Sequence, residues 1–83
     1  MKFKAEVEVM PLEALLDPQG KAVESGLSNL GLSAIENVRI GKHIHLLLDA
    51  ASESEAEKMV EEACKKLLAN QIMESYSYSI SAV

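Results

Sequence analysis

Three stretches of the chain alternate between hydrophobic and polar residues, which is the pattern of a strand that buries one face. They cover residues 2–9, 35–48 and 75–82. In the middle stretch the even-numbered positions from 38 to 48 are apolar except at Lys42. In the last stretch, tyrosine, isoleucine and alanine at the even positions alternate with four serines. The pattern therefore predicts three extended segments.

The stretch between the first two strands predicts a helix. Asp17 is a good N-cap and Pro18 suits the first helical position, so the helix should begin at residue 18. It should run to about residue 30 and end at Gly31, the usual left-handed stop. Its inward face holds the apolar residues at helical spacing: Ala22, Val23, Gly26, Leu27 and Leu30.

A second helix should begin at Ser52 or Ser54, because either hydroxyl can cap a first turn that also carries acidic residues. Its apolar positions again form one stripe: Ala56, Met59, Val60, Ala63, Cys64, Leu67 and Leu68. Charged residues occupy the remaining positions and form supporting pairs four residues apart. We therefore expect Met59 and Cys64 to be buried.

The middle stretch is interrupted at Gly41-Lys42, and two interpretations remain open. A two-residue turn there would make a hairpin and give the βαββαβ order of a ferredoxin-like fold. A continuous strand with a bulge at the glycine would be long enough to be shared across a segment-swapped dimer. In both cases we predict a single α+β domain over residues 1–83, with two helices on one face of an antiparallel sheet.

Composition and charge exclude several classes of protein. The 83 residues carry a net charge of −5 and no basic stripe, which disfavours binding to nucleic acid. No apolar run approaches the ~20 residues of a membrane span, and no signal peptide precedes the first strand. Cys64 is the only cysteine, so a reducing compartment is expected. These features indicate a cytoplasmic protein that does not bind membranes.

The residues with reactive side chains do not form a recognisable site. His43 and His45 share one strand face, yet a zinc site needs three or four ligands and the chain has no other histidine. Cys64 lies in an apolar stripe, whereas a nucleophilic thiol needs an electropositive, partly exposed setting. No nucleophile, base and orienting group come together in the pattern. We therefore predict no metal site and no catalytic residue in this chain.

The residues that local rules explain least flank the first helix. Glycine in a first helical turn and glycine in a strand both cost local stability, and charged residues lie beside both glycines. We interpret this set as a surface that docks a partner protein, because glycine lets another backbone approach and arginine fits a carboxylate. An anion site at the helix N-terminus is the alternative, although the P-loop pattern is absent. The set comprises Asp17, Gln19, Gly20, Lys21, Arg39, Gly41 and Lys42.

Three motifs occur in order along the chain: DPQGKAV at residues 17–23, VRIGK at residues 38–42 and KLLAN at residues 66–70. This series resembles the PurS family, the small subunits of phosphoribosylformylglycinamidine (FGAM) synthase. The resemblance covers nearly the whole chain and implies a PurS-like fold. It also implies a non-catalytic subunit of a ligase that uses ATP and glutamine to convert formylglycinamide ribonucleotide into formylglycinamidine ribonucleotide in purine biosynthesis.

The same resemblance implies the partners. The subunit would bridge a glutaminase subunit, which releases ammonia, and a large synthetase subunit, and would assist ammonia transfer between them. ATP and Mg²⁺ are expected in the large subunit, with no cofactor in this chain. Relatives in the family also imply a homodimer or a dimer of dimers.

Two other functions share the broad architecture. The main alternative is a stand-alone ACT-like domain that senses a small molecule, although such modules are usually attached to another domain. A small acylphosphatase-like enzyme would need a glycine-rich phosphate loop ending in Phe-Arg, which the sequence lacks. Fold alone does not choose among the three functions. The ordered motifs favour the PurS family.

Overall fold

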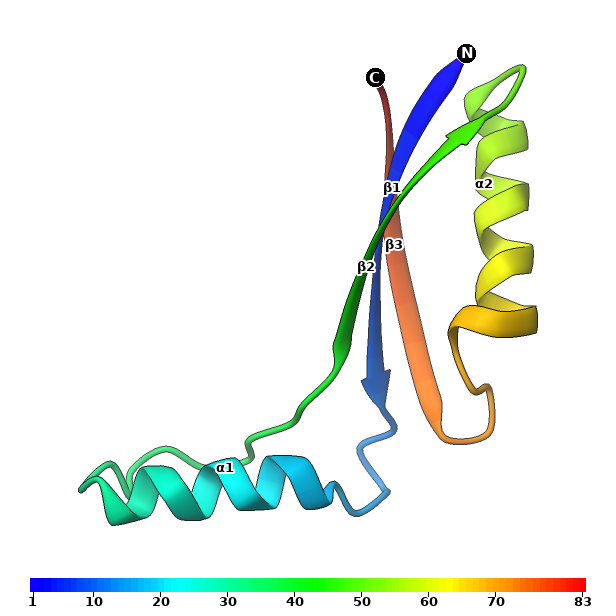
Figure 1. Cartoon of the computed structure of the whole chain (residues 1–83). Helices are drawn as coiled ribbons and strands as arrows, with labels where there is room; N and C mark the ends of the chain where they lie inside the picture. Colours follow the sequence, from blue (N-terminus) through cyan, green and yellow to red (C-terminus); the bar gives the residue numbers. More distant parts are fainter.

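The computed structural model describes all 83 residues, and they alternate between strand and helix along the chain (Figure 1). The molecule is elongated, with extents of 51 × 27 × 14 Å. One helix extends from one end of the sheet while both termini lie at the other end (Figure 1). The elements in order are β1 (Lys2–Pro11), α1 (Pro18–Asn29), β2 (Lys42–Asp49), α2 (Glu53–Ala63), a π-helical turn (Cys64–Leu68) and β3 (Glu74–Ala82).

The central strand of the sheet is β1, which pairs antiparallel with β2 on one side and with β3 on the other. Val7 lies opposite Ile44 of β2 and Tyr78 of β3. The alternation predicted from the sequence is confirmed, because one face of β1 is apolar and buried while the other is polar. The buried residues of β1 are Phe3, Ala5, Val7 and Val9.

The apolar face of the sheet is covered by α2 (Figure 1). The helix begins after Ser52, whose Oγ accepts a hydrogen bond from the Glu55 N–H at 3.2 Å. Ala56, Val60 and Cys64 are buried beneath the helix, among the apolar residues of β1. The predicted burial of Cys64 is therefore confirmed.

The last turn of this helix departs from the expected stripe. Ala69 N–H donates to the Cys64 carbonyl oxygen at 3.1 Å, five residues back, which is the spacing of a π-turn. This wider turn directs Leu67 outward, where it is 84% exposed, and brings Ala69 into the core. Met59 lies at the edge of the buried stripe and is 42% exposed. The expected burial of Met59 and Leu67 is therefore wrong.

The bounds and caps of α1 agree with the sequence prediction. Pro18 occupies the start of the helix and Asp17 caps it. At the other end Gly31 has φ of +83°, and Leu32 N–H donates to the Leu27 carbonyl oxygen at 2.9 Å. These two features form the glycine stop of a Schellman motif.

The position of α1 differs from that of α2. The α+β class, with two helices and an antiparallel sheet, is confirmed. Within this single chain, however, only α2 lies against the sheet, whereas α1 projects beyond the end of the strands (Figure 1). The predicted inward face of α1 is consequently uncovered, with Val23 42% and Leu30 76% exposed.

The middle stretch forms a shorter strand than the pattern predicts. In this chain β2 begins at Lys42, and residues 35–41 run from the far end of α1 back to the sheet without strand pairing. Within the single chain, Gly41-Lys42 is therefore neither a hairpin turn nor a bulge inside one long strand, and a longer strand shared across a dimer stays a prediction. The sheet has three strands instead of the four of a ferredoxin-like fold. Alternation alone does not make a strand, because the backbone also needs a pairing partner.

Candidate functional site

The predicted partner-binding residues cluster where the chain leaves the sheet for α1 and where it returns. We call this region the junction and define it as residues 12–20 and 37–42. Neither buried apolar cluster contains a residue of α1, so within the chain the contacts of the junction determine how the helix leaves the sheet. The structure brings Asp17, Gly20 and Arg39 together inside the junction.

Asp17 connects the two halves of the junction and is buried, with 8% of its surface exposed. Its Oδ1 accepts a hydrogen bond from the Gly20 N–H at 3.0 Å, which caps α1. Its Oδ2 accepts one from the Ile40 N–H at 2.8 Å, on the segment that returns to β2. These hydrogen bonds, led by that from Ile40, hold the pKa of Asp17 below its ordinary value of 3.8.

Arg39 makes the connection in the opposite direction. Its Nη1 donates to the Leu15 carbonyl oxygen at 3.0 Å and its Nη2 donates to the Leu12 carbonyl oxygen at 2.7 Å. Its Nε is buried without a hydrogen-bond partner. The guanidinium fork is thus occupied by this chain's own backbone. Within the single chain Arg39 therefore does not present this fork to a partner's carboxylate, as the sequence argument assumed.

The two unexplained glycines are required by close backbone contacts within the fold. A Cβ at Gly20 would lie 2.1 Å from the Val38 carbonyl oxygen. A Cβ at Gly41 would lie 2.4 Å from the Val9 carbonyl oxygen and 2.2 Å from Met10 Sδ. The sequence argument that these glycines are kept for a partner is therefore wrong in its reason, because the chain itself occupies the space.

The other members of the predicted set are exposed. Gln19 and Lys21 lie on the first turn of α1. Gly41 directly precedes β2, and Lys42 is its first residue. Lys42 Nζ is 3.7 Å from Glu74 Oε2 and its side chain is 58% exposed. Beside Lys21 a groove of about 340 Å³ separates α1 from the returning segment. Its lining consists of Ala14, Leu15, Leu16, Asp17, Lys21, Glu24, Asn37, Val38 and Arg39.

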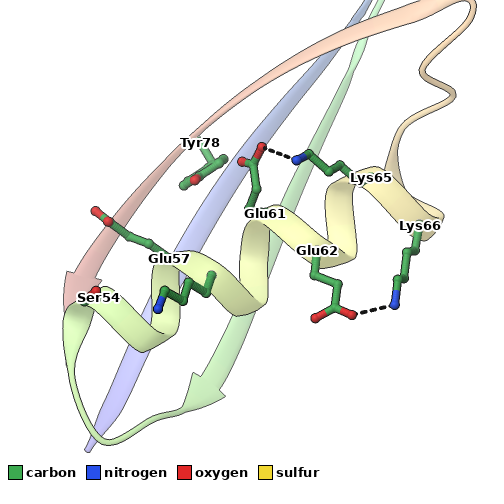
Figure 2. Close-up of a pocket in the computed structure, with 8 residues that line it drawn as sticks. Ser54, Glu57, Glu61, Glu62, Lys65, Lys66 and Tyr78 are labelled. Carbon is green, nitrogen blue, oxygen red and sulfur yellow. Dashed lines mark hydrogen bonds and ion pairs between the residues drawn. The ribbon is translucent and has the colours of Figure 1, made fainter.

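A second polar cluster, which the sequence analysis missed, joins α2 to β3. The Tyr76 hydroxyl donates to Glu61 Oε1 at 2.7 Å, and Lys65 Nζ lies 3.7 Å from the same oxygen. Figure 2 shows Glu61 directed towards Tyr78 and Lys65, at the side of the helix that faces β3. The sequence feature that could have revealed this cluster is the position of Glu61 next to Val60, at the margin of the apolar stripe of α2.

The electrostatics of this cluster explain its protonation states. The hydrogen bond to Glu61, together with burial, raises the pKa of Tyr76 to about 12. Burial, followed by the hydrogen bond to Glu61, also raises the pKa of Tyr78. The Tyr76 and Tyr78 hydroxyls lower the pKa of Glu61 in return. The result is an ionised carboxylate held by neutral phenols, an arrangement that fixes α2 on β3.

The remaining candidate residues lie apart from both clusters. His43 and His45 share the open face of the sheet, as predicted, and His43 Nδ1 contacts Glu8 Oε1. No group of three or more His, Cys, Asp or Glu side chains is placed to hold a metal ion. Burial, followed by the charge of Glu61, raises the pKa of the Cys64 thiol. No helix is long and apolar enough to span a bilayer.

Residues 4–82 match the model of the family described as PurS, phosphoribosylformylglycinamidine (FGAM) synthase. The chain belongs to the PurS family. Its curated PurS relatives include the subunit of Synechocystis, 44% identical over 81 residues, which are 98% of this chain and 81% of the relative. The PurS subunit of Bacillus subtilis is 38% identical over 81 residues, or 98% of this chain and 95% of the relative.

Solved PurS structures have the same fold. A chain of the PurLQS complex from Thermotoga maritima superposes with a TM-score of 0.89 at 30% identity, covering 98% of this chain and 99% of that chain. Bacillus subtilis PurS superposes with a TM-score of 0.84 at 38% identity, covering 96% and 99%. The chain is thus a PurS subunit of FGAM synthase, a ligase of purine biosynthesis. No observation favours the ACT-like alternative.

Proposed function

We propose that this chain is the non-catalytic subunit that bridges the glutaminase and large synthetase subunits of FGAM synthase and assists ammonia transfer between them. The observation that carries the proposal is the family match over residues 4–82. The likeness to a chain of the Thermotoga maritima PurLQS complex supports it. The chemistry of the chain agrees, because its one thiol is buried with a raised pKa.

The reaction explains why a bridging subunit is useful. The complete complex would convert formylglycinamide ribonucleotide, glutamine and ATP into formylglycinamidine ribonucleotide, glutamate, ADP and phosphate. Ammonia released at one site must reach the other before it is protonated or diffuses away. Holding the two sites together in a water-poor assembly raises the yield of transfer. We assign ATP and Mg²⁺ to the large synthetase subunit and no cofactor to this chain.

We further propose that copies of the chain associate through α1 as a homodimer or a dimer of dimers. The support is the uncovered apolar stripe of α1, which continues into Leu32 and Ile35, 46% and 44% exposed. Only 11 of 83 residues are buried, so the core of one chain is small. In such a dimer residues 35–41 would lengthen β2 by pairing with the second copy.

A matched pair of variants tests the dimer. Leu30→Glu places a carboxylate in the stripe of α1 and should shift sedimentation from dimer to monomer at micromolar concentration. Leu67→Glu changes a leucine of similar exposure on the π-turn, 84% against 76% for Leu30, and should leave the dimer intact. A wild-type chain that sediments as a monomer would contradict the proposal.

We propose that the exposed members of the predicted set contact a partner subunit, namely Gln19, Lys21, Gly41 and Lys42. Asp17, Gly20 and Arg39 then act from within the junction, because their polar groups are engaged by this chain. The net charge of −5 is consistent with protein partners and with no nucleic acid. A single cysteine kept as a free thiol fits a cytoplasmic complex.

The experiment that tests the bridging function is omission of the chain from a reconstituted complex. The same mixture of glutaminase and synthetase subunits is supplied with glutamine or with an ammonium salt, with and without this chain. Glutamine-dependent synthesis should require the chain, whereas ammonia-dependent synthesis should be much less affected. Full glutamine-dependent activity without the chain would overturn the proposal.

A further inference from the structure

Within one chain, no hydrophobic core sets the direction of α1 relative to the sheet. The helix projects from the end of the sheet (Figure 1), and its apolar stripe is uncovered. The chain reaches α1 through residues 12–17 and returns through residues 30–41, which contain no strand pairing. Two such connections alone would act as a hinge, because loops with few buried contacts open easily.

Asp17 closes this hinge at its centre. One carboxylate oxygen is bonded to the first turn of the outgoing helix and the other to the backbone of the returning segment at Ile40. The two acceptors belong to one rigid, buried group. Rotation of α1 about the junction would therefore break at least one of the two hydrogen bonds.

Arg39 closes the hinge from the other side. Its fork, which starts on the returning segment, reaches the carbonyl oxygens of Leu12 and Leu15 on the outgoing loop. Leu12 N–H in turn donates to the Met73 carbonyl oxygen at 2.9 Å, just before β3. The outgoing loop is thus connected both to the returning segment and to the body of the sheet.

Beside the groove, the backbones of α1 and of the returning segment also touch directly. The Cα of Gly20 lies so near Val38 that even a methyl group would meet its carbonyl oxygen at 2.1 Å. At Gly41 the chain passes with similar closeness against the Val9 carbonyl oxygen. Hydrogen bonds in both directions and close backbone contact together make the junction a fixed elbow instead of a flexible linker.

We infer that Asp17 and Arg39 are positioning residues that fix the direction of α1 relative to the sheet and thereby the alignment of the subunits that the chain bridges. The first half of this inference depends only on the chain itself. The second half rests on the proposed bridging function. Neither residue is a catalytic residue, because each acts by holding α1.

The direction of α1 is measured as a distance between two spin labels. Ser28→Cys near the end of α1 and Ser77→Cys on the open face of β3 provide two exposed sites in a Cys64→Ala chain. Labelled chains are refolded with an excess of unlabelled chain so that only distances within one chain are recorded. The intact junction should give one narrow distance distribution.

Two variants break the elbow at different points. Asp17→Asn keeps the size of the side chain but replaces one acceptor with a donor that faces a backbone N–H. Arg39→Met keeps an apolar stem and removes the fork. Either variant should at least double the width of the distance distribution, whereas Asp49→Asn, at the other end of β2, should leave it unchanged. An unchanged distribution in both junction variants would overturn the inference.

Circular dichroism and the functional assay separate the remaining outcomes. The sheet should stay folded in both variants, and loss of the sheet in both would contradict a role limited to α1. Glutamine-dependent synthesis should fall roughly tenfold with ammonia-dependent synthesis nearly unchanged, because misplacement of about 1 Å can cost up to ~100-fold in rate. A broadened distance distribution with unchanged glutamine-dependent synthesis would overturn the role of the two residues in aligning the subunits. The bridging function itself would not be affected, because the omission experiment tests it separately.

Discussion

Gly20 and Val38 touch through their backbones, so that a methyl group at Gly20 would lie 2.1 Å from the Val38 carbonyl oxygen. This contact joins the first turn of α1 to the segment that returns to β2. Gly26, in the same helix, has no atom within 4 Å of the position that a Cβ would occupy, apart from its chain neighbours and the backbone of its own helix. The fold therefore requires glycine at position 20 but not at position 26, although both lie in the same helix.

A matched pair of substitutions follows from this difference. Gly20→Ala should destabilise the protein by more than about 1 kcal/mol, because the backbones must separate. Gly26→Ala should stabilise it by about 0.5–1 kcal/mol, the usual gain of alanine over glycine in a helix. Denaturant unfolding measures both changes. Equal shifts of the unfolding midpoint in the two variants would contradict the close contact at Gly20.

We expect Asp17 to make a contribution to the free energy of unfolding that is lost at acidic pH. The pKa of Asp17 is lower in the folded protein than its ordinary value of 3.8, so its contribution is fully present above that value. It is lost as pH falls through 3.8 and then through the lower pKa of the folded state. Asp17→Asn should reduce the slope of unfolding free energy against pH in this range.

High salt distinguishes the contribution of Asp17 to stability from that of the exposed acidic residues. The pKa of Glu62 is also lowered, through a hydrogen bond and ion pair with Lys66 on the surface. Salt screens that pair but leaves the backbone hydrogen bonds of Asp17 in place. The effect of Asp17→Asn on the slope of unfolding free energy against pH should therefore persist in high salt. Its disappearance there would show that the stabilisation of Asp17 is mainly ionic.

We expect Tyr76 to make a contribution to stability that is lost at alkaline pH. Its pKa is raised from 10.0 to about 12, so the stability it contributes is present below pH 10 and is lost between these two values. The chain has two tyrosines and no tryptophan, which makes phenolate absorbance a clean measurement. Glu61→Gln should bring the titration of Tyr76 closer to 10, because it removes the carboxylate that holds the proton. An unchanged titration in that variant would contradict the pair.

Cys64 and Leu67 test the π-turn. Cys64 is buried and its pKa is raised, so a thiol reagent should modify it slowly in the native protein and rapidly in denaturant. In a Cys64→Ala chain, Leu67→Cys should react rapidly, because that position is 84% exposed. Slow modification at position 67 would mean that the helix continues in α geometry and buries the side chain at this position.

The features that the sequence predicted depend on local pattern. The alternation of β1, the caps of α1 and the burial of Ala56, Val60 and Cys64 all follow from residues a few positions apart, and all are confirmed. The family resemblance was also readable, because its three motifs occur in order along the chain. Physical chemistry at short range therefore predicted the elements but not their full arrangement.

The features that the sequence did not predict depend on contacts between distant segments. The projection of α1, the occupied fork of Arg39 and the space required at Gly20 and Gly41 all arise where residues 12–20 meet residues 37–42. Local propensity recorded only that the glycines were costly. It could not indicate that the carbonyl oxygens of Val38 and Val9 fill the space beside them.

Lys21 offers the sharpest test of the docking surface, because its side chain is exposed and makes no hydrogen bond or ion pair within the chain; only its backbone N–H is engaged, by the Asp17 carbonyl oxygen. Lys21→Glu should leave the fold intact, since surface substitutions usually change stability by about ±0.5 kcal/mol. In the reconstituted complex it should weaken assembly and reduce glutamine-dependent synthesis more than ammonia-dependent synthesis. Lys4→Glu, an equal charge reversal on the open face of the sheet, is the control and should change neither. If the two variants behave alike, the partner binds elsewhere, and the face of α1 beside the groove is not the docking surface.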